Sequence, residues 1–500
     1  MPTWTPQIRS VSLRQLCPAA RFFGADDIVV SSVAADSRDV SAGDLFAALA
    51  GTRTDGHHFV GRALERGATA VLAERFVPTQ GRPLCVVPDS RVAFARLCQA
   101  LTNNPSRRLK VIGVTGTNGK TTTSWLIRGI LEAAGIRTGL LGTIEFSDGV
   151  WAAPSPYTTP PAAVLAGWLA RIEAAGCSHA VMEVSSHALS QSRVAGVDFD
   201  VVCVTNVRHD DLDYHATASN YQEAKARIFE HLVPEGFAVL NADDELCPSY
   251  LAGLCGPVLT VGIDAAAEIT ATPVEQYKSE QTFLLSIGNE TAVVRTPLIG
   301  RHNIYNCLQA TAVGFAYGID LTTIVRGLEA IGRIPGRLER IECGQTFGVF
   351  VDYAHTADAL AGVLSTLREV TSGRVICVFG AGGDRDRSKR PKMGRAVEET
   401  ADLAIITSDN PRNEHPGQIT HDVLQGFARP ASVELVLDRR AAIHRALALA
   451  QKGDCVLIAG KGHEDYQIVG DKTLAFDDRE VARQWLYGFA ATERFYRKSA

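Results

Sequence analysis

The chain has 500 residues, of which 46% are hydrophobic and 21% charged, and its formal net charge is −5. A chain of this length is expected to form about three domains, each with its own core. No block of lysine and arginine is long enough to form a nucleic-acid footprint. We therefore expect small anionic ligands, met by local positive clusters, and no nucleic-acid partner.

Eleven cysteines are scattered between Cys17 and Cys455 without a Cys-x-x-Cys pair, which argues against a disulfide framework and a zinc site. We expect these thiols to be buried and reduced. The N-terminus lacks a basic segment followed by an apolar stretch, and no apolar run reaches the roughly 18 residues that span a membrane. The sequence therefore predicts a cytoplasmic protein without membrane insertion.

The first hundred residues alternate short apolar runs with Gly-rich turns, which is typical of a small α/β domain. We predict strands within residues 28–33, 45–49, 70–72 and 84–87. The polar segment 103–108 is broken by Pro105 and is interpreted as a linker. The first domain is thus predicted to span residues 1–106.

Residues 113–123 read Gly-Val-Thr-Gly-Thr-Asn-Gly-Lys-Thr-Thr-Thr, between an apolar run and a helical pattern. A strand, a glycine turn and a helix N-terminus form a phosphate cradle, because free backbone N–H groups and the helix dipole attract anions. Lys120 can reach the terminal phosphates while Thr121 ligates magnesium. An ordinary Gly-rich turn would leave Lys120 unexplained, so we predict a nucleoside triphosphate site.

Further apolar runs alternate with helical patterns such as residues 160–175, and they lie within residues 111–114, 140–144, 180–184, 201–204 and 238–240. This alternation predicts a mostly parallel sheet, which binds ligands at the carboxyl ends of its strands. Glu183 is placed to hold a second magnesium ion there, although a solvated acid also explains it. Residues 209–215 crowd three carboxylates and two imidazoles, which cations or hydrogen bonds would have to stabilise.

A second boundary is predicted near residues 331–337, giving a central domain 107–334 and a C-terminal domain 335–500. In the last domain, apolar runs at residues 375–379, 403–407 and 455–458 each lead into a charged loop. Arginine forks in such loops suit a carboxylate, and acids such as Asp409 and Glu464 suit an ammonium group. Each loop alone is also explained as a solvated turn, but together they predict a site for a zwitterion.

The loop Gly116–Thr121, Gly-Thr-Asn-Gly-Lys-Thr, resembles that of the Mur ligases of bacterial peptidoglycan synthesis, and the resemblance covers essentially the whole chain. Further matching motifs are Asp36-Ser37-Arg38 with 43–46, Thr158-Thr159-Pro160, residues 183–187, residues 351–356 and Asp409-Asn410-Pro411-Arg412. The last tetrapeptide resembles the signature of family members that add meso-diaminopimelate, and the lysine-adding members differ there.

The resemblance implies an α/β protein of three domains: a smaller N-terminal UDP-binding domain, a central P-loop-type ATPase domain with a mostly parallel sheet, and a C-terminal Rossmann-like domain. It implies an ATP-dependent amide ligase that adds meso-diaminopimelate to UDP-N-acetylmuramoyl-L-alanyl-D-glutamate through an acyl phosphate. ATP, Mg²⁺ and carbon dioxide, which carbamylates a lysine, would be required, and we expect a monomer. The alternatives are a lysine-adding ligase, a folylpolyglutamate synthetase-like ligase, which lacks a counterpart of the first hundred residues, and a nucleotide-dependent switch.

The resemblance also assigns roles to individual residues. The catalytic residues would be Lys120, Glu183 and the carbamylated Lys225. ATP would be bound by Gly116, Thr117, Asn118, Gly119, Lys120, Thr121, Thr122, Asn303, Arg337 and Asp352. The UDP-linked substrate would be bound by Ala35, Ser37, Thr52, Arg53, Thr54, Thr158, Thr159, Ser185, Gln191 and Arg193. Diaminopimelate would be bound by Arg385, Asp409, Asn410, Pro411, Arg412, Gly460 and Glu464.

Metal ions would be held by Thr121, Glu183, the carbamylated Lys225 and Asp211. Asp211 marks a departure from the family, whose members usually carry a histidine at this position. A carboxylate can still ligate magnesium, which prefers oxygen ligands.

Overall fold

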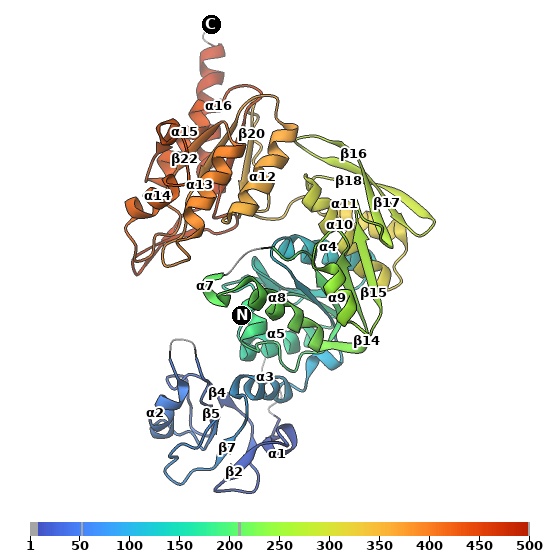
Figure 1. Cartoon of the computed structure of the whole chain (residues 1–500), viewed down its shortest axis with the longest axis vertical. Helices are drawn as coiled ribbons and strands as arrows, with labels where there is room; N and C mark the ends of the chain where they lie inside the picture. Colours follow the sequence, from blue (N-terminus) through green and yellow to red (C-terminus); the bar gives the residue numbers. More distant parts are fainter. Residues whose placement is uncertain (1–8, 52–53, 209–211, 499–500) are drawn as a thin grey trace.

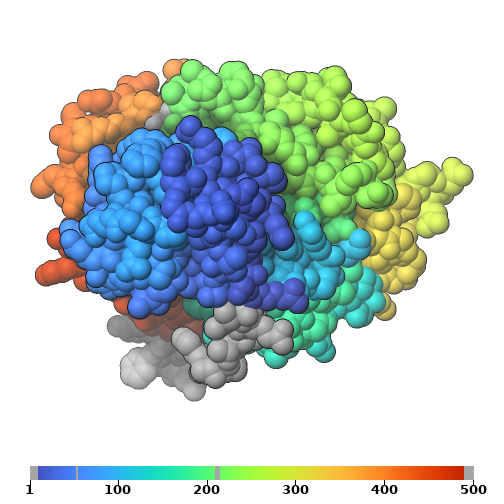
Figure 2. All heavy atoms as spheres, turned by 90° about the horizontal axis from the view of Figure 1, so that it is seen from below, coloured from blue at the N-terminus to red at the C-terminus, as the bar shows by residue number. Residues whose placement is uncertain are grey.

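The computed structural model describes residues 9–51, 54–208 and 212–498. The chain forms three lobes, each built around its own sheet and following one another along the sequence (Figure 1). Figure 2 looks at the molecule from the N-terminal side, where the first lobe covers much of the central one. The α/β class and the three-domain architecture expected from the sequence are confirmed.

The N-terminal lobe holds a five-stranded sheet in the order β2-β7-β6-β5-β4, which is parallel except for β2. Its strands are β2 (Arg21–Phe23), β4 (Val33–Ala34), β5 (Leu45–Ala47), β6 (Ala70–Ala73) and β7 (Leu84–Val86), with a separate pair β1 (Val11–Ser12) and β3 (Val29–Val30). Its helices are α1 (Leu13–Leu16), α2 (Val60–Glu65) and α3 (Ser90–Leu101), with a 3₁₀ turn at Gly56–Phe59.

The structure refines three sequence predictions for this lobe. Residues 28–33 form two strands of different sheets, because the backbone between them turns so that Ser32 accepts a hydrogen bond from Leu45 and donates one to Asp44. The segment 103–108, interpreted as a linker, lies between α3 and β8 and contains a 3₁₀ turn at Pro105–Arg107 in which Pro105 and Ser106 are buried. The strand predicted at residues 45–49 ends at Ala47.

The central lobe contains an eleven-stranded sheet in the order β11-β10-β9-β12-β8-β13-β14-β15-β16-β17-β18. Neighbours from β9 to β16 are parallel, and the strands at both edges are antiparallel. The strands are β8 (Lys110–Thr115), β9 (Thr138–Leu141), β10 (Glu145–Ser147), β11 (Ala152–Pro154), β12 (His179–Glu183), β13 (Phe199–Val204), β14 (Leu232–Asn241), β15 (Val258–Gly262), β16 (Ile269–Gln276), β17 (Gln281–Ile287) and β18 (Glu290–Thr296).

Helices cover both faces of this sheet, as expected for parallel strands joined by crossovers. One core packs the strands against α4 (Lys120–Ala133), α10 (Arg301–Ala316) and α11 (Leu321–Ala330). The other packs them against α5 (Ala162–Ala174), α6 (Ser186–Ser190), α8 (Ala218–Ala226) and α9 (Cys247–Gly253), with a 3₁₀ turn at Arg227–His231. The short α7 (Leu212–His215) precedes α8.

The C-terminal lobe holds a six-stranded sheet in the order β19-β20-β24-β21-β22-β23, parallel except for β19. Its strands are β19 (Glu339–Arg340), β20 (Gly348–Asp352), β21 (Val375–Phe379), β22 (Leu403–Ile406), β23 (Val433–Leu435) and β24 (Cys455–Ala459), with a hairpin of β25 (Tyr466–Val469) and β26 (Lys472–Ala475). Its helices are α12 (Ala357–Val370), α13 (Lys389–Thr400), α14 (Pro416–Leu424), α15 (Arg439–Leu449) and α16 (Asp478–Lys498), with a 3₁₀ turn at Pro430–Ser432.

All eleven cysteines are free, and eight of them are buried. Cys17 and Cys343 are half-buried and Cys255 is exposed, so the expectation of uniformly buried thiols is wrong for these three. Among the residues that the structure describes, no helix is long and apolar enough to cross a membrane.

Candidate active site

The phosphate loop lies between β8 and α4, as the sequence predicts, and two of its glycines are required by the backbone. Gly119 is the N-cap of α4 with φ +86°, and Gly116 has φ +145°. A Cβ atom on Gly119 would lie 2.3 Å from Asn306 Oδ1, and one on Gly116 would lie 1.8 Å from Thr205 Oγ1. Only glycine fits at either position.

Two lysine side chains meet at one carbonyl oxygen of this loop. Lys120 Nζ donates to Gly116 O at 2.9 Å and to Thr117 O at 3.1 Å. Lys225, which is buried in α8, donates from Nζ to the same Gly116 O at 2.8 Å. The ring of Tyr221 lies 4.5 Å from Lys225 Nζ, and its hydroxyl is 2.9 Å from Thr117 Oγ1. The structure therefore brings Lys225, which is 109 residues from Gly116 in the sequence, onto the phosphate loop.

Glu183, at the carboxyl end of β12, is buried and accepts hydrogen bonds from two elements. Thr121 Oγ1 donates to its Oε2 at 3.0 Å. Thr143 donates from N to Oε1 at 2.8 Å and from Oγ1 to Oε2 at 2.9 Å. Because Thr143 is hydrogen-bonded to Glu183, it does not continue the strand predicted at residues 140–144, which ends at Leu141. The carboxylate and hydroxyl oxygens at this point are the hard ligands that suit Mg²⁺, which keeps several waters of its own.

The third lobe reaches this site through Arg337. Its Nη2 donates to Thr121 Oγ1 at 2.9 Å, and its guanidinium lies 4.7 Å from the centre of the Tyr353 ring. Asp352 is buried beside it and accepts from the backbone N of Leu338 and Ala354 at 2.5 and 2.7 Å. Burial raises the pKa of Asp352, which the positive charge of Arg337 opposes. Arg337 therefore touches the phosphate loop, whereas Asp352 shapes the segment that carries it.

Other residues expected to hold ATP are placed less directly. Asn303 is buried at the start of α10, where its Oδ1 accepts from Asn306 Nδ2 at 3.0 Å. Asn306 in turn accepts from Thr123 Oγ1 at 3.2 Å. Asn306 thus connects Asn303 to the first turns of α4. The loop's own Asn118 accepts at its carbonyl from Asn206 Nδ2 and Thr205 Oγ1, and Thr122 is buried in α4.

A connected group surrounds the start of α6. Thr159 Oγ1 donates to Glu183 O at 2.8 Å and accepts from Ser185 N at 2.9 Å. Arg193 donates to Thr159 O at 2.9 Å and to Gln191 Oε1 at 2.7 Å. Burial lowers the pKa of Arg193, and a nearby arginine, Arg91, adds to the lowering. Thr158 joins through a 3.1 Å hydrogen bond from Thr143 Oγ1. The structure thus gathers the five central-lobe residues expected at the UDP-linked substrate.

The remaining residues expected at that substrate belong to the N-terminal lobe. Ala35 and the buried Ser37 follow β4, and the exposed Thr54 accepts at its carbonyl from Gly51 N at 3.1 Å. Thr52, Arg53 and Asp211 lie outside the described residues.

A cleft of about 940 Å³ lies between α3 of the first lobe and the central lobe. It is lined by Arg91 of α3 and by central-lobe residues that include Ser190, Tyr214, His215, Asn220, Glu223, Arg227 and Glu230. Arg91 also donates to Ala50 O at 2.5 Å, which ties it to the loop that leads to Thr54. A space of this size accommodates a nucleotide-sized ligand.

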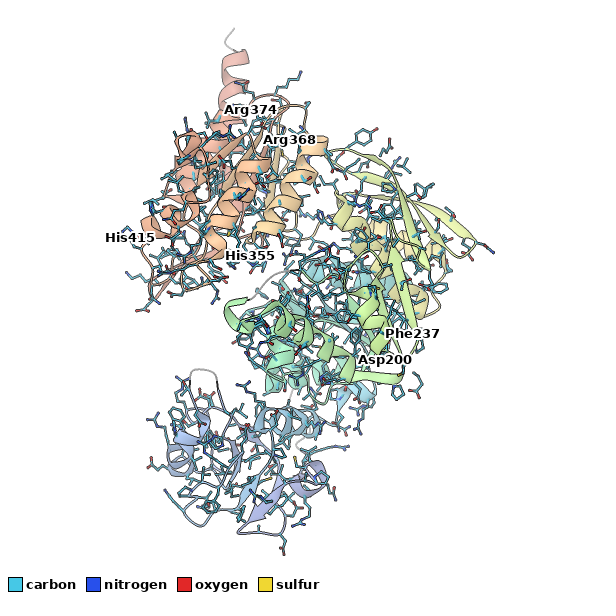
Figure 3. The ribbon with its side chains drawn as sticks, in the orientation of Figure 1. Asp200, Phe237, His355, Arg368, Arg374 and His415 are labelled. Atoms are coloured by element: carbon cyan, nitrogen blue, oxygen red, sulfur yellow. The ribbon has the colours of Figure 1, made fainter. Side chains whose placement is uncertain are left out.

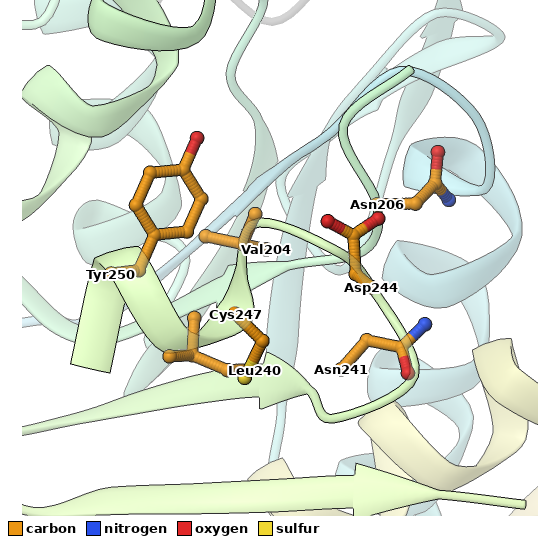
Figure 4. A pocket seen from close by; sticks show the side chains of 7 residues that line it. All are labelled: Val204, Asn206, Leu240, Asn241, Asp244, Cys247 and Tyr250. Carbon is orange, nitrogen blue, oxygen red and sulfur yellow. The ribbon is translucent and has the colours of Figure 1, made fainter. Parts of the chain in front are cut away.

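A second cavity near the phosphate loop is much smaller. It holds about 10 Å³ and is lined by Val204, Asn206, Leu240, Asn241, Asp244, Cys247 and Tyr250 (Figure 4). This is room for about one water molecule. Asp244 is occupied within the protein, because its Oδ2 accepts from Val207 N at 3.0 Å. The cavity is therefore a small gap in the packing of the central lobe, too small for a substrate.

The three charged loops of the C-terminal lobe converge at the carboxyl ends of β21, β22 and β24. Asn410 Nδ2 donates to Glu464 Oε2 at 2.9 Å, and Arg412 Nη1 donates to Gly383 O at 2.8 Å. A Cβ on Gly382 would lie 3.1 Å from Arg412 Nη1 and 3.6 Å from the side chain of the exposed Arg385.

Two glycines allow this close approach. A Cβ on Gly383 would lie 1.9 Å from Pro411 O, and one on Gly460 would lie 2.6 Å from Asp409 Oδ2. Arg412 has φ +51°, an uncommon conformation for arginine, so its direction is set by the loop. The two arginines and two carboxylates predicted to face a zwitterion therefore belong to one cluster.

Family models match the three lobes in turn. The Mur ligase family catalytic domain matches residues 29–100, the Mur ligase middle domain residues 114–314, and the Mur ligase glutamate ligase domain residues 336–462. A UDP-N-acetylmuramoyl-L-alanyl-D-glutamate--2,6-diaminopimelate ligase of Geobacillus thermodenitrificans is 44% identical over 467 residues, which are 92% of this chain and 95% of that protein. The chain belongs to the Mur ligase family. It is therefore an ATP-dependent amide ligase.

Further comparisons agree with this Mur ligase assignment. A ligase of the same name from Syntrophomonas wolfei is 42% identical over 93% of this chain and 96% of its own. A solved structure of a diaminopimelate ligase of that name is 33% identical, with a TM-score of 0.68, and covers 96% of this chain and 100% of its own. A folylpolyglutamate synthase of Mycobacterium tuberculosis shares the fold at 20% identity and a TM-score of 0.62, but covers only 74% of this chain.

Several residues of this Mur ligase's site were not found from the sequence. Thr143, Asn306 and Tyr221 contact the phosphate loop or Glu183 directly, and Arg91 lines the cleft. None of them lies in a motif with a recognisable spacing, because each is brought to the site by a different crossover. Asn306 does not stand out within α10, because Asn303, Gln309 and Thr311 of the same helix are also buried and polar.

Proposed function

We propose that this Mur ligase joins meso-diaminopimelate to UDP-N-acetylmuramoyl-L-alanyl-D-glutamate. The observation that carries the substrate choice is the cluster of Arg385, Asp409, Arg412 and Glu464 at the carboxyl end of the C-terminal sheet. A substrate with an ammonium and a carboxylate at its far end matches such a set, because carboxylates attract the ammonium and an arginine fork holds the carboxylate. Lysine lacks that far carboxylate. The names of the curated relatives support the same substrates.

The reaction proceeds by activation of a carboxylate. An oxygen of the D-glutamate γ-carboxylate attacks the γ-phosphorus of ATP, and ADP leaves. The amine of diaminopimelate then attacks the acyl carbon, loses a proton, and displaces phosphate to leave an amide. Lys120 and Arg337, which both contact the phosphate loop, would balance the charge that moves during phosphoryl transfer.

Thr121 and Glu183 would hold Mg²⁺, which would neutralise the phosphate oxygens. We further propose that Lys225 is carbamylated: its ammonium group loses a proton, and the free amine then adds carbon dioxide and releases a second proton, which turns a cation into an anion. The shared contact of Lys120 and Lys225 with Gly116 O supports this, because two ammonium groups at one carbonyl repel each other. Carbamylation would replace that repulsion with attraction.

The UDP-linked substrate is proposed to lie in the cleft between the first two lobes. Arg91 lines it from the N-terminal lobe and Ser190 from the central lobe, and Thr159, Ser185 and Arg193 form the bonded group of the central lobe. We also propose that the ligase works in the cytoplasm, as a monomer. The domain limits 1–106, 107–334 and 335–500 also stand as proposals.

Mass analysis of the product, formed with meso-diaminopimelate and L-lysine in competition, tests the proposed function. We expect the diaminopimelate adduct, and phosphate release that requires both the UDP-linked dipeptide and the amino acid. Preferential incorporation of lysine would refute the role given to Arg412. Phosphate release that is the same without either substrate would refute the ligase reaction itself.

A further inference from the structure

Lys461 is a buried lysine at the centre of the amino-acid cluster, and no role has been given to it above. It follows β24 and Gly460, whose φ is +114°, and its side chain is 0% exposed. Removing an ammonium group from water is costly unless charge and hydrogen bonds replace the solvent. The partners of Lys461 therefore show what its charge is used for.

Its ammonium group lies beside Asn410 and Glu464, and Nζ is 5.6 Å from the centre of the Tyr466 ring. Lys461 Nζ lies 3.0 Å from Asn410 Oδ1 and 3.3 Å from Glu464 Oε2. Asn410 Nδ2 donates to the same Glu464 Oε2 at 2.9 Å, and Asn410 Oδ1 also accepts from Ile468 N at 3.0 Å. Lys461, Asn410 and Glu464 thus form a closed triangle. The oxygen and the nitrogen of the Asn410 side-chain amide are therefore both hydrogen-bonded within the protein. Lys461 and Asn410 both donate to the same oxygen of Glu464, Oε2.

Two carboxylate oxygens remain as acceptors next to this triangle. Glu464 Oε1 accepts no hydrogen bond from the described residues, and Asp409 Oδ2 is buried without a hydrogen-bond partner there. The guanidinium of Arg439 is 4.0 Å from Asp409 Oδ2, but it is held by a buried ion pair with Asp478 at 2.7 Å. A buried acceptor without a donor is unfavourable, so this pair is suited to receive an ammonium group.

We propose that Lys461 is a positioning residue for the amino-acid substrate, which orients Glu464 through Oε2 and locks the Asn410 amide so that Glu464 Oε1 and Asp409 Oδ2 are left to bind the substrate's ammonium group. This inference rests on the proposed function and extends it. Lys461 also offsets one of the two negative charges, which lets Asp409 and Glu464 lie in one pocket before the substrate arrives.

Steady-state kinetics of Lys461→Met in the full chain tests this role. Methionine is unbranched and only one heavy atom shorter than lysine, and it removes the charge. We expect KM for meso-diaminopimelate to rise by about tenfold or more, while KM for ATP and for the UDP-linked dipeptide stays within about twofold. If Lys461 only stabilised the fold, Lys461→Met would change the KM of all three substrates, or would lower the melting temperature alone.

The matched control is Arg374→Met. Arg374 pairs with Asp454 at 2.8 Å and lies at the amino end of the same sheet, at the top of the C-terminal lobe, whereas His355 lies at its lower edge (Figure 3). This variant removes an ion pair from the same lobe without touching the amino-acid cluster. We expect wild-type KM for meso-diaminopimelate, even if the lobe becomes less stable.

The double variant Lys461→Met/Glu464→Gln provides the second test and covers the case in which Lys461→Met alone does not fold, since it leaves no unpaired buried charge. If Lys461 acts through Glu464, its KM for meso-diaminopimelate will not exceed that of Glu464→Gln. An unchanged KM in Lys461→Met, a rise equalled by Arg374→Met, or additive effects in the double variant would overturn the inference. Failure of the wild-type chain to use meso-diaminopimelate would instead overturn the proposed function, and this inference with it.

Discussion

At the scale of single residues, the contact of two lysines with one carbonyl oxygen is the feature with the clearest chemical consequence. Lys120 and Lys225 both donate to Gly116 O, at the point where phosphates are expected to bind. A second ammonium adds little to phosphate binding at a carbonyl that is already satisfied. A carbamate at the same place would supply oxygen ligands for a cation and an acceptor for Lys120.

We therefore predict that Lys225→Ala lowers kcat by about 100-fold or more, because an anion beside the phosphate loop is lost. Acetate or another short carboxylate should restore part of the rate in Lys225→Ala and leave the wild-type rate unchanged. The measurement is phosphate release with and without added carboxylate. Lys452→Ala, at an exposed lysine, serves as the control. A wild-type enzyme that keeps its full rate after removal of carbon dioxide would contradict the role given to carbamylation.

At the scale of secondary-structure elements, α4 provides a direct test of the phosphate loop, because glycines with positive φ flank both of its ends. Gly119 caps its start at φ +86° and packs against Asn306, whereas Gly135 follows its end at φ +76° with nothing within 4 Å of a Cβ. An alanine pays the cost of the left-handed conformation at both positions, roughly 1 kcal/mol each. Only at Gly119 does it also collide with a neighbour.

Gly119→Ala is therefore predicted to weaken ATP binding by about tenfold or more, because the loop must move to relieve the 2.3 Å contact with Asn306 Oδ1. Gly135→Ala should bind ATP normally while showing a modest loss of stability. Isothermal titration with ATP, together with thermal melting, separates the two effects. Equal ATP affinities in the two variants would show that the backbone of the loop adapts freely.

The sequence was sufficient for elements whose signal is local. The apolar run of β21 and the phosphate loop before α4 were found at or near their true limits, since a buried parallel strand is continuously apolar and the loop has a fixed spacing. The antiparallel strands β16, β17 and β18 were missed. Their alternating polar and apolar residues resemble surface loops until the neighbouring strand is known.

The sequence predicts those site residues that belong to a motif. It does not predict those that only the fold brings together. Lys225 is an ordinary helical lysine by its surroundings in the sequence, and only the family resemblance singled it out. Thr143 and Arg337 illustrate the limit, because they come from a turn after β9 and from the start of the third lobe, yet they meet at Glu183 and Thr121. Such convergence depends on crossovers that the residue pattern does not encode.

At the scale of the whole molecule, His463 lies at the contact between the C-terminal and central lobes, as Arg337 does. This histidine precedes Glu464 in the amino-acid cluster, and its ring lies 5.2 Å from that of Tyr353. Burial lowers its pKa to about 3, and the charges of Arg337 and Arg479 act in the same direction, while a hydrogen bond with the Thr143 backbone opposes them. His463 is therefore neutral in this arrangement of the lobes.

When the lobes separate, water reaches His463 and its pKa returns toward the ordinary value of about 6.5. Below that pH the open form takes up a proton and the closed form does not, so closure loses up to about 1.4 kcal/mol per pH unit until the pH approaches 3. Above pH 6.5 His463 is neutral in both forms, so it does not disfavour closure there. We predict that X-ray scattering shows a larger radius of gyration at pH 5.5 than at pH 7.5.

His463→Gln should reduce this pH dependence, because glutamine takes up no proton in either form. His421→Gln, at an exposed histidine of α14, should leave it as in the wild type. Scattering curves of both variants at the two pH values provide the comparison. The same expansion in His463→Gln would assign the effect to other groups.

The distribution of the buried cysteines gives each lobe a chemical reporter of its own. Burial raises the pKa of Cys98 in the N-terminal lobe, of Cys307 in the central lobe and of Cys455 in the C-terminal lobe to about 12. A thiol reacts with alkylating reagents as its thiolate, so these three are protected for as long as their lobes stay folded. The exposed Cys255 reacts first and counts as the internal standard. The order in which Cys98, Cys307 and Cys455 become labelled as the denaturant concentration rises would then show which lobe unfolds first, without any engineered probe.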